Sequence, residues 1–209
     1  MMTDMNMNEF LEVLSSSEPV PGGGGACGYV AAVGMSLGNM VLALTTGKKK
    51  YAEYQEEIEA LIVKSTELTK KLAECMDKDA KAFEPLSKAY GLPKNTEEEI
   101  KYREEVMEKA LLEATLAPLS MMEEIMEAME FIERIAKIGS RIAISDAGVG
   151  IAMCEAAMKG ASLNVFINTK LMKSKDKADE LNFKADELLA KAEHIASETF
   201  GEVMDVVRP

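Results

Sequence analysis

Hydrophobic residues recur at spacings of three and four along almost the whole chain, and this is the period of an amphipathic α-helix. Alternation with a period of two, which is typical of half-buried strands, is absent, and the one β-like run, 165–167, is too short to form a sheet. Helices are predicted at about 3–14, 26–46, 51–90, 96–138, 141–159 and 162–204. The pattern therefore predicts an all-α fold: a bundle of long antiparallel helices in a single domain, 1–209.

The ends of these helices are expected at capping residues and helix breakers. The expected N-caps are Thr3 or Asp4 for the first helix and Asn95 or Thr96 for the fourth. The expected C-terminal stops are Gly47, Gly91, Gly139 and Gly160, and a further break is expected at 174–176. Pro118 lies inside the fourth helix and should bend it, because proline removes one backbone hydrogen bond.

The second predicted helix differs from the others because no charged residue occurs between Pro19 and Gly47. A helix that is apolar on every side is either buried or spans a membrane, and this one is long enough to span, with Gly34 and Gly38 forming a G-x-x-x-G pair. Its glycines and polar residues dilute the hydrophobicity, so we expect a buried helix of small residues at the centre of the bundle and no membrane partner. Helices of this kind often lie at subunit contacts.

Charge and cysteine content narrow the possible functions. The 24 basic and 36 acidic residues give a net charge of −12, which disfavours nucleic acid and anionic lipid as partners. Cys27, Cys75 and Cys154 are widely spaced in apolar surroundings, so neither a disulfide framework nor a metal site is expected, and a reducing cytoplasm is the simplest location. The single histidine, His194, disfavours schemes that need two. The N-terminus has no basic region typical of a signal peptide.

A run of glycines precedes the charge-free helix. Residues 23–28 match G-x-G-x-x-G, but no strand precedes them, so a dinucleotide site is not supported. Backbone N–H groups of Gly23, Gly24 and Gly25 could still bind a ligand at a helix N-terminus; a plain turn explains them equally well. Lys50 ends a run of three lysines, which is either a solvated helix end or an anchor for a polyanionic tail.

Asp79 is the most informative polar residue of the third predicted helix. It lies in the middle of an apolar stripe, whereas Asp77 is about 200° round the helix and should face solvent. The stripe consists of Leu68, Leu72, Cys75, Ala82, Phe83 and Leu86. Burial raises the pKa of a carboxyl group, which suits a general acid or base. A core aspartate that caps a loop or pairs with a lysine is the alternative, and the helical pattern alone favours it.

A second polar group comes from the last third of the chain. Asp146 falls among apolar neighbours at helical spacing, although Ser145 or Asp146 could be an ordinary N-cap. Asn164 and Asn168 are one turn apart on the same helical face. Two amides so placed can recognise the donors and acceptors of a heterocycle, or they can cap a neighbouring helix.

Taken in order, several short motifs resemble one known family. They are Pro21-Gly22-Gly23-Gly24, Lys48-Lys49-Lys50-Tyr51, Asp79-Ala80-Lys81-Ala82-Phe83, 92–96, Arg103, Ala117-Pro118, Gly139 with Ser145-Asp146, and 164–168. This order is similar to the formiminotransferase-cyclodeaminase C-terminal family, which includes cyclodeaminase domains and stand-alone bacterial methenyltetrahydrofolate cyclohydrolases.

The resemblance implies a helical homodimer that binds a tetrahydrofolate derivative as substrate, with no resident cofactor and no metal. It also implies that Asp79 is the catalytic carboxylate. Candidates to hold the pterin or the aminobenzoate are Gly23, Gly24, Gly25, Asp146, Asn164 and Asn168, and Lys50 is the candidate for the glutamate tail. Gly25 departs from the family, which often has serine or alanine there.

Three functions are consistent with these residues. No transferase domain accompanies the bundle in these 209 residues, so we expect a methenyltetrahydrofolate cyclohydrolase, which converts 5,10-methenyltetrahydrofolate and water to 10-formyltetrahydrofolate. The alternative is a formiminotetrahydrofolate cyclodeaminase, an ammonia lyase that forms the methenyl compound. A non-catalytic helical module that binds folate or acts as a scaffold is the third.

Overall fold

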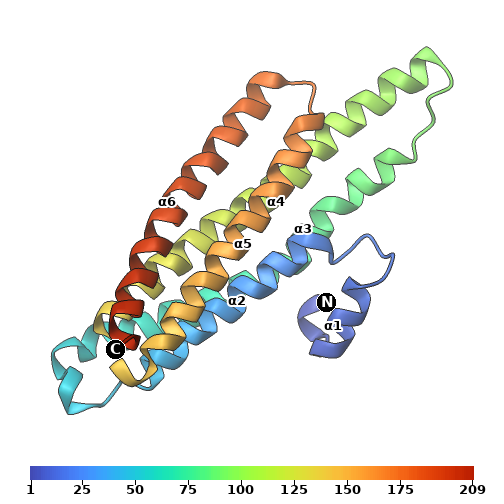
Figure 1. Cartoon of the computed structure of the whole chain (residues 1–209). Coiled ribbons are helices and arrows are strands. Elements are labelled where there is room, and N and C mark those ends of the chain that lie inside the picture. Colours follow the sequence, from blue (N-terminus) through green and yellow to red (C-terminus); the bar gives the residue numbers. More distant parts are fainter.

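The computed structural model describes residues 1–209, which form helices and no strand (Figure 1). The α-helices are α1 (Met7–Leu14), α2 (Gly22–Ala43), α3 (Gln55–Tyr90), α4 (Glu97–Ile138), α5 (Ile144–Leu171) and α6 (Lys175–Val207). Three short 3-10 helices, η1 (Met2–Asp4), η2 (Lys49–Tyr54) and η3 (Arg141–Ala143), connect them or precede them. The predicted all-α fold class is confirmed.

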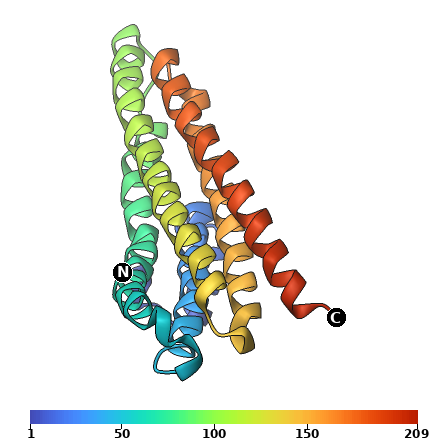
Figure 2. The same cartoon turned by 90° about the vertical axis from the view of Figure 1, so that its left-hand side faces the viewer.

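Helices α2 to α5 form a four-helix bundle in which each helix is antiparallel to the next (Figures 1 and 2). Helix α2 packs against α3 and α5, α4 closes the fourth side, and α6 packs on α5 and α4. Helix α2 has 22 residues, whereas α3 has 36 and α4 has 42. Because α3 and α4 continue beyond the start of α2, the N-terminus of α2 lies part-way along the bundle (Figure 1).

Small residues bring α2 unusually close to its neighbours, as the sequence predicts. A Cβ atom at Gly34 would lie 2.9 Å from the carbonyl oxygen of Gly150 on α5, and one at Gly28 would lie 3.1 Å from that of Leu72 on α3. Met35 and Leu42 of the same helix are fully buried. By length and composition α2 could also cross a membrane, with a mean hydropathy of 1.5 over its most apolar window, half of which is buried.

Four expected helix starts differ from the structure: α3 begins at Gln55 and not at 51, α6 begins at Lys175 and not at 162, and the first two helices differ as follows. The first helix is capped by Asn6, whose Oδ1 accepts hydrogen bonds from the backbone N–H groups of Asn8 and Glu9, and not by Thr3 or Asp4. The 3-10 turn η1 contains Thr3 and Asp4 instead. Helix α2 starts four residues earlier than expected, at Gly22, so the glycines form its first turn. Tertiary packing overrides the low helix propensity of glycine there.

The predicted end of the fifth helix at Gly160 is wrong, because α5 continues to Leu171. A Cβ atom at Gly160 would lie 2.5 Å from Cys27 Sγ, so this glycine permits a close helix contact and does not end the helix. The break expected at 174–176 is confirmed, since α6 starts at Lys175. Thr96 caps α4 with a reciprocal Glu99 contact, also as expected.

The contact between α2 and α5 can be tested with two glycine substitutions. In Gly34→Ala the new methyl group would lie 2.8 Å from Cys154 Sγ and 2.9 Å from a backbone oxygen, so we expect a loss of about 1–3 kcal/mol in the free energy of unfolding. In Gly201→Ala on α6 nothing lies within 4 Å, so we expect a gain of roughly 0.5–1 kcal/mol from helix propensity. Urea unfolding measures both, and equal stability of the two variants would contradict the close approach.

Candidate active site

A pocket of about 240 Å³ opens where α2 begins, between α2, α3, α4 and α5. The loop 19–21 and the first turn of α2 form one wall, and Phe83 and Ile167 add apolar surface. The predicted site residues in its lining are Gly23, Gly24, Asp79, Asn164 and Asn168. The fold therefore gathers five of the eight predicted site residues from three helices.

The carboxylate of Asp79 lies directly against the backbone of Gly24. A Cβ atom at position 24 would be 2.1 Å from Asp79 Oδ2 and 2.7 Å from Oδ1, so a side chain there would force the carboxylate to move. The observed position of the carboxylate therefore requires glycine at position 24, because the carboxylate occupies the volume of a side chain. This contact joins the glycine motif and the aspartate motif, which are 55 positions apart in the sequence.

Burial raises the pKa of Asp79 from 3.8 to about 6. No lysine or arginine forms an ion pair with it, and it does not cap a loop, so both alternative structural roles are excluded by the contacts. The side chain is only partly buried and lines the pocket, so a ligand can reach it. A carboxyl group of this kind can accept and return a proton near neutral pH.

Backbone and amide groups supply the polar surface around the carboxylate. The first N–H groups of α2 have no partner within the helix, and they lie at the positive end of its dipole. Asn168 donates from Nδ2 to the Ala114 carbonyl oxygen (2.9 Å), and Asn164 donates to the Gly160 carbonyl oxygen (3.0 Å). Neither amide oxygen accepts a hydrogen bond from the chain, so both can accept from a ligand.

Three predicted site residues do not line the pocket at Asp79. Gly25 packs against Pro21, where a Cβ atom would lie 2.6 Å from the proline Cβ, and it does not line the pocket. Asp146 is in the first turn of α5, eighteen residues before Asn164 and therefore about 27 Å from it along the helix. Lys50 is in η2, at the same far end of the bundle. Within one chain, neither residue can contact a ligand beside Asp79.

Some pocket residues were not identified from the sequence. Phe83 follows Asp79 by four positions, so its place on the same helical face could have indicated it. Ala114 gives no such signal, because only the packing of α4 against α5 brings its carbonyl group to Asn168. Cys27 is also close, since burial and the charge of Asp79 raise the pKa of its thiol to about 11. It therefore remains neutral.

Asp77 does not face solvent as the helical pattern predicted. Its carboxylate is half-buried and accepts a hydrogen bond from the backbone N–H of Met2 (2.8 Å) and one from Thr3 Oγ1 (3.4 Å). The N-terminal segment folds back over α3, an arrangement that helical periodicity cannot reveal. All three cysteines are free and buried, and His194 is exposed beside Glu198.

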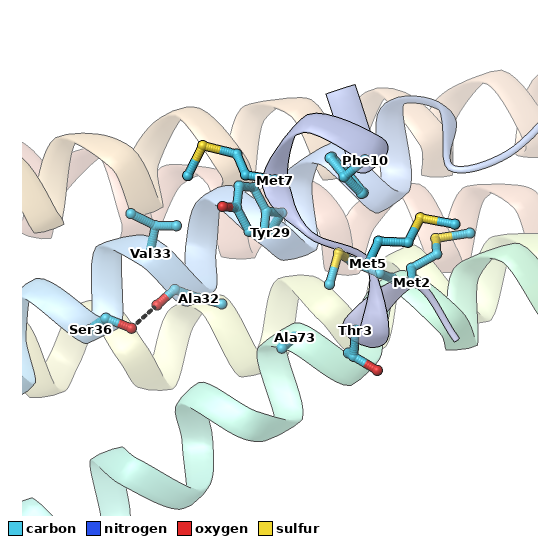
Figure 3. Close-up of a pocket in the computed structure, with 11 residues that line it drawn as sticks. Met2, Thr3, Met5, Met7, Phe10, Tyr29, Ala32, Val33, Ser36 and Ala73 are labelled. Atoms are coloured by element: carbon cyan, nitrogen blue, oxygen red, sulfur yellow. Dashed lines mark hydrogen bonds between the residues drawn. The ribbon is translucent and has the colours of Figure 1, made fainter. Parts of the chain in front are cut away.

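A second pocket of about 240 Å³ lies under this N-terminal segment (Figure 3). It is lined by Met2, Met5, Met7 and Met76, by the rings of Phe10 and Tyr29, and by small residues of α2. It contains no carboxylate, amine, imidazole or thiol, so it offers no acid–base group for catalysis. The pocket at Asp79 is the stronger candidate for chemistry.

The fold and this pocket define a class of helical-bundle enzyme with one buried carboxylate beside a glycine-rich helix N-terminus. The chain belongs to the formiminotransferase-cyclodeaminase family, whose sequence profile matches residues 6–187. The resemblance inferred from the motifs is thereby confirmed. Relatives in this family are enzymes that act on folate derivatives, and this chain is an enzyme of the same kind.

Individual relatives make the comparison more specific. A methenyltetrahydrofolate cyclohydrolase from Methylorubrum extorquens is 39% identical over 183 residues, which are 88% of each chain. The formimidoyltransferase-cyclodeaminase of Mus musculus is 28% identical over 97% of this chain, which spans only 37% of that longer protein. The crystal structure of formiminotetrahydrofolate cyclodeaminase from Thermotoga maritima superposes with a TM-score of 0.81 at 26% identity, covering 99% of this chain and 98% of that one.

Because Gly24 lies against the carboxylate of Asp79, substitution of this glycine should change the pKa of the carboxyl group. In Gly24→Ala the added methyl group displaces the carboxylate toward solvent, so the pKa of Asp79 should fall from about 6 toward 3.8. In Gly23→Ala the methyl group meets Asn164 no closer than 3.7 Å, so the pKa of Asp79 should stay close to 6. NMR titration of the side-chain carboxyl carbon measures the pKa of Asp79 in both variants. An unchanged pKa in Gly24→Ala would show that the carboxylate does not lie against position 24.

Proposed function

We propose that this protein is a methenyltetrahydrofolate cyclohydrolase in which Asp79 is the acid–base group. The observation that supports this most strongly is a carboxyl group with a pKa near 6 in a pocket formed by a helix N-terminus and two asparagines. The cyclohydrolase of Methylorubrum extorquens, which matches most of the chain, supports the choice of reaction.

The reaction needs one group that can take up and release a proton. Water attacks the carbon between N5 and N10 of the cationic methenyl compound while ionised Asp79 accepts a proton from that water. The neutral tetrahedral adduct then breaks its bond to N5 as the hydroxyl group becomes the formyl oxygen. Asp79 returns a proton to N5, and the hydroxyl proton leaves to solvent, so one proton is released overall.

Electrostatics favour the same assignment. The substrate carries a positive charge spread over N5, the bridging carbon and N10. Asp79 is partly desolvated and has no cation of its own chain beside it, so its charge acts on the bound cation with little competition. A carboxylate already neutralised by a lysine would not have this effect.

The remaining lining suits a flat heterocycle. The free amide oxygens of Asn164 and Asn168 can accept hydrogen bonds from pterin N–H groups. The N–H groups of Gly23 and Gly24 can donate to a pterin oxygen or nitrogen. Phe83 offers an aromatic face for the ring system. These binding roles are part of the proposal.

The second candidate function is formiminotetrahydrofolate cyclodeaminase, which the whole-chain similarity to the Thermotoga maritima enzyme favours. Here the formimino group reacts in its protonated form, N5–CH=NH2⁺: N10 attacks its carbon, Asp79 takes the N10 proton and passes it to the resulting NH2 group, and the C–N bond then breaks to release ammonia and leave the methenyl cation. The same carboxyl group and the same folate position serve both reactions.

We also propose that the protein acts in the cytoplasm, without a membrane or nucleic-acid partner and without a resident cofactor. The net charge of −12 supports the absence of a nucleic-acid or membrane partner, because it opposes binding to phosphate backbones and anionic lipid. The three buried free thiols are consistent with a reducing compartment.

A spectroscopic assay of the methenyl compound distinguishes the candidate functions. We expect the purified protein to consume 5,10-methenyltetrahydrofolate faster than the spontaneous reaction. Formation of the methenyl compound from 5-formiminotetrahydrofolate would indicate the cyclodeaminase instead. Folate binding with neither reaction would identify a non-catalytic module and overturn the proposal.

Substitution of Asp79 tests the mechanism and its energetic cost together. Asp79→Asn should lower kcat by about 10²–10⁴-fold while folate binding is retained, because the amide cannot take up a proton. Asp77→Asn removes the same charge two residues away and should leave kcat within about twofold, since Asp77 contacts only the N-terminal segment. Full activity of Asp79→Asn would exclude the carboxyl group from the reaction.

The Asp79→Asn variant should be more stable than the wild type at neutral pH. The folded-state pKa of about 6 is above the unfolded value of 3.8, so folding favours the protonated form, and stability is lost as pH rises through this window. At pH 7 the ionised carboxylate costs roughly 2–3 kcal/mol, and Asp79→Asn should recover part of it. Thermal unfolding should show this advantage shrinking as the pH falls from 7 toward 4.

The pH dependence of turnover follows from the ionised form being the base. We expect kcat/KM to fall below pH 6 with an apparent pKa of about 6, after subtraction of the spontaneous hydrolysis. A profile that is flat from pH 4.5 to 7 would assign the proton transfer to another group.

A further inference from the structure

Two prolines lie inside helices of this bundle, Pro85 in α3 and Pro118 in α4. A proline within a helix has no N–H to donate, so the carbonyl oxygen four residues earlier loses its backbone partner, and the proline ring crowds that carbonyl group. For Pro118 the affected carbonyl is that of Ala114. Both residues are buried, and a buried carbonyl oxygen without a donor destabilises the folded state. The carbonyl of Ala114 therefore needs a donor from outside its own helix.

The side-chain amide of Asn168 supplies this donor. Asn168 belongs to α5, which packs against α4, and its Nδ2 lies 2.9 Å from the Ala114 carbonyl oxygen. A carbonyl oxygen can only accept a hydrogen bond, so the nitrogen of the amide must face α4 and its oxygen cannot. The orientation of the Asn168 amide is thus fixed by a carbonyl that Pro118 has left without its backbone partner.

The fixed amide leaves its oxygen available to the pocket at Asp79. Ala114 and Asn168 both line this pocket. No group of the chain donates to Asn168 Oδ1, yet this oxygen is not among the fully buried polar atoms that lack a partner, so a ligand can reach it. The pocket presents an acceptor at this position and therefore favours a ligand with a hydrogen-bond donor there, such as an N–H group of a pterin.

The proline of α3 shows why burial matters. Pro85 takes the backbone donor from the carbonyl of Lys81, but both of these residues are exposed, so water can serve as the donor. Pro85 does not line the pocket at Asp79. The same local change in a helix has a consequence for the pocket only where the freed carbonyl is buried against a polar side chain of another helix.

We propose that Pro118 is a positioning residue of the active site: it withholds the backbone donor of the Ala114 carbonyl, so that Asn168 Nδ2 takes this place and Asn168 Oδ1 is held as the acceptor for an N–H group of the bound heterocycle. The inference rests on the proposed function, because it takes the ligand to be a folate. Pro118 does not line the pocket and acts through Asn168. A proline that only bends α4 would act independently of Asn168, and this difference can be measured.

The first experiment measures the hydrogen bond without any substrate. Asn168→Ala leaves the Ala114 carbonyl without a donor, so the folding equilibrium constant should fall about tenfold or more. In a Pro118→Ala background the backbone N–H of residue 118 can take over, so the loss caused by Asn168→Ala should be at least about threefold smaller. Urea unfolding of the four proteins gives both values. Alanine is the strongest helix former, so Pro118→Ala should fold, and Pro118→Val repeats the test with a side chain close in size to proline.

The second experiment measures the consequence for substrate binding. Pro118→Ala should raise KM for the folate about three- to tenfold with kcat within about twofold, because Asn168 binds the ring and takes no part in the proton transfer. Adding Pro118→Ala to Asn168→Ala should change KM by less than about twofold, since no amide is left to position. The matched control Pro85→Ala, at an exposed proline outside the pocket, should leave both KM and kcat within about twofold of the wild type.

Independent effects of the two substitutions would overturn the proposal. If Pro118→Ala and Asn168→Ala were additive in stability or in KM, Pro118 would not act through Asn168. An unchanged KM in Pro118→Ala, or a loss of kcat without a change in KM, would contradict the positioning role in the same way. A wild-type protein inactive on both folate substrates would instead contradict the proposed function, and the unfolding measurements would still decide whether Pro118 fixes the Asn168 amide.

Discussion

The structure of the site depends on one contact, in which the carboxylate of Asp79 occupies the space that a side chain at position 24 would need. The contact removes water from one side of the carboxyl group without supplying a cation. Burial therefore raises the pKa of Asp79 to about 6, where a single group can both accept and release a proton. Under the proposed function, this one group carries both proton transfers of the reaction.

Helix α2 explains how a chain of ordinary amphipathic helices can build this contact. Its small residues allow backbone-to-backbone approach to α5 at Gly34 and to α3 at Gly28, so the helix lies deeper in the bundle than a leucine-rich helix could. Helix α2 begins between α3 and α5, and the pocket at Asp79 lies next to its first turn. The absence of charge along α2 has two consequences: it permits burial on three sides, and it leaves an apolar fourth side.

The cost of the site appears in the folding free energy. An ionised, partly buried carboxylate without an ion-pair partner destabilises the folded state at neutral pH. The bundle tolerates this because its apolar core is large, with Met122, Ile125 and Met129 of α4 fully buried. Retention of an unfavourable group in an otherwise well-packed core is typical of a functional position.

The helical period of the sequence determined the fold class, the C-terminal ends of α1, α3 and α4 and the position of Asp79 on an apolar stripe, because these depend on local spacing. The sequence could not determine that α2 begins at Gly22 or that α5 continues through Gly160, since packing against Asp79 and Cys27 decides whether a glycine ends a helix. It also could not show which motifs meet. The tertiary structure brought Gly24, Asp79 and Asn168 together and left Lys50 and Asp146 about one helix length away, because only the order and length of antiparallel helices determine which ends are neighbours.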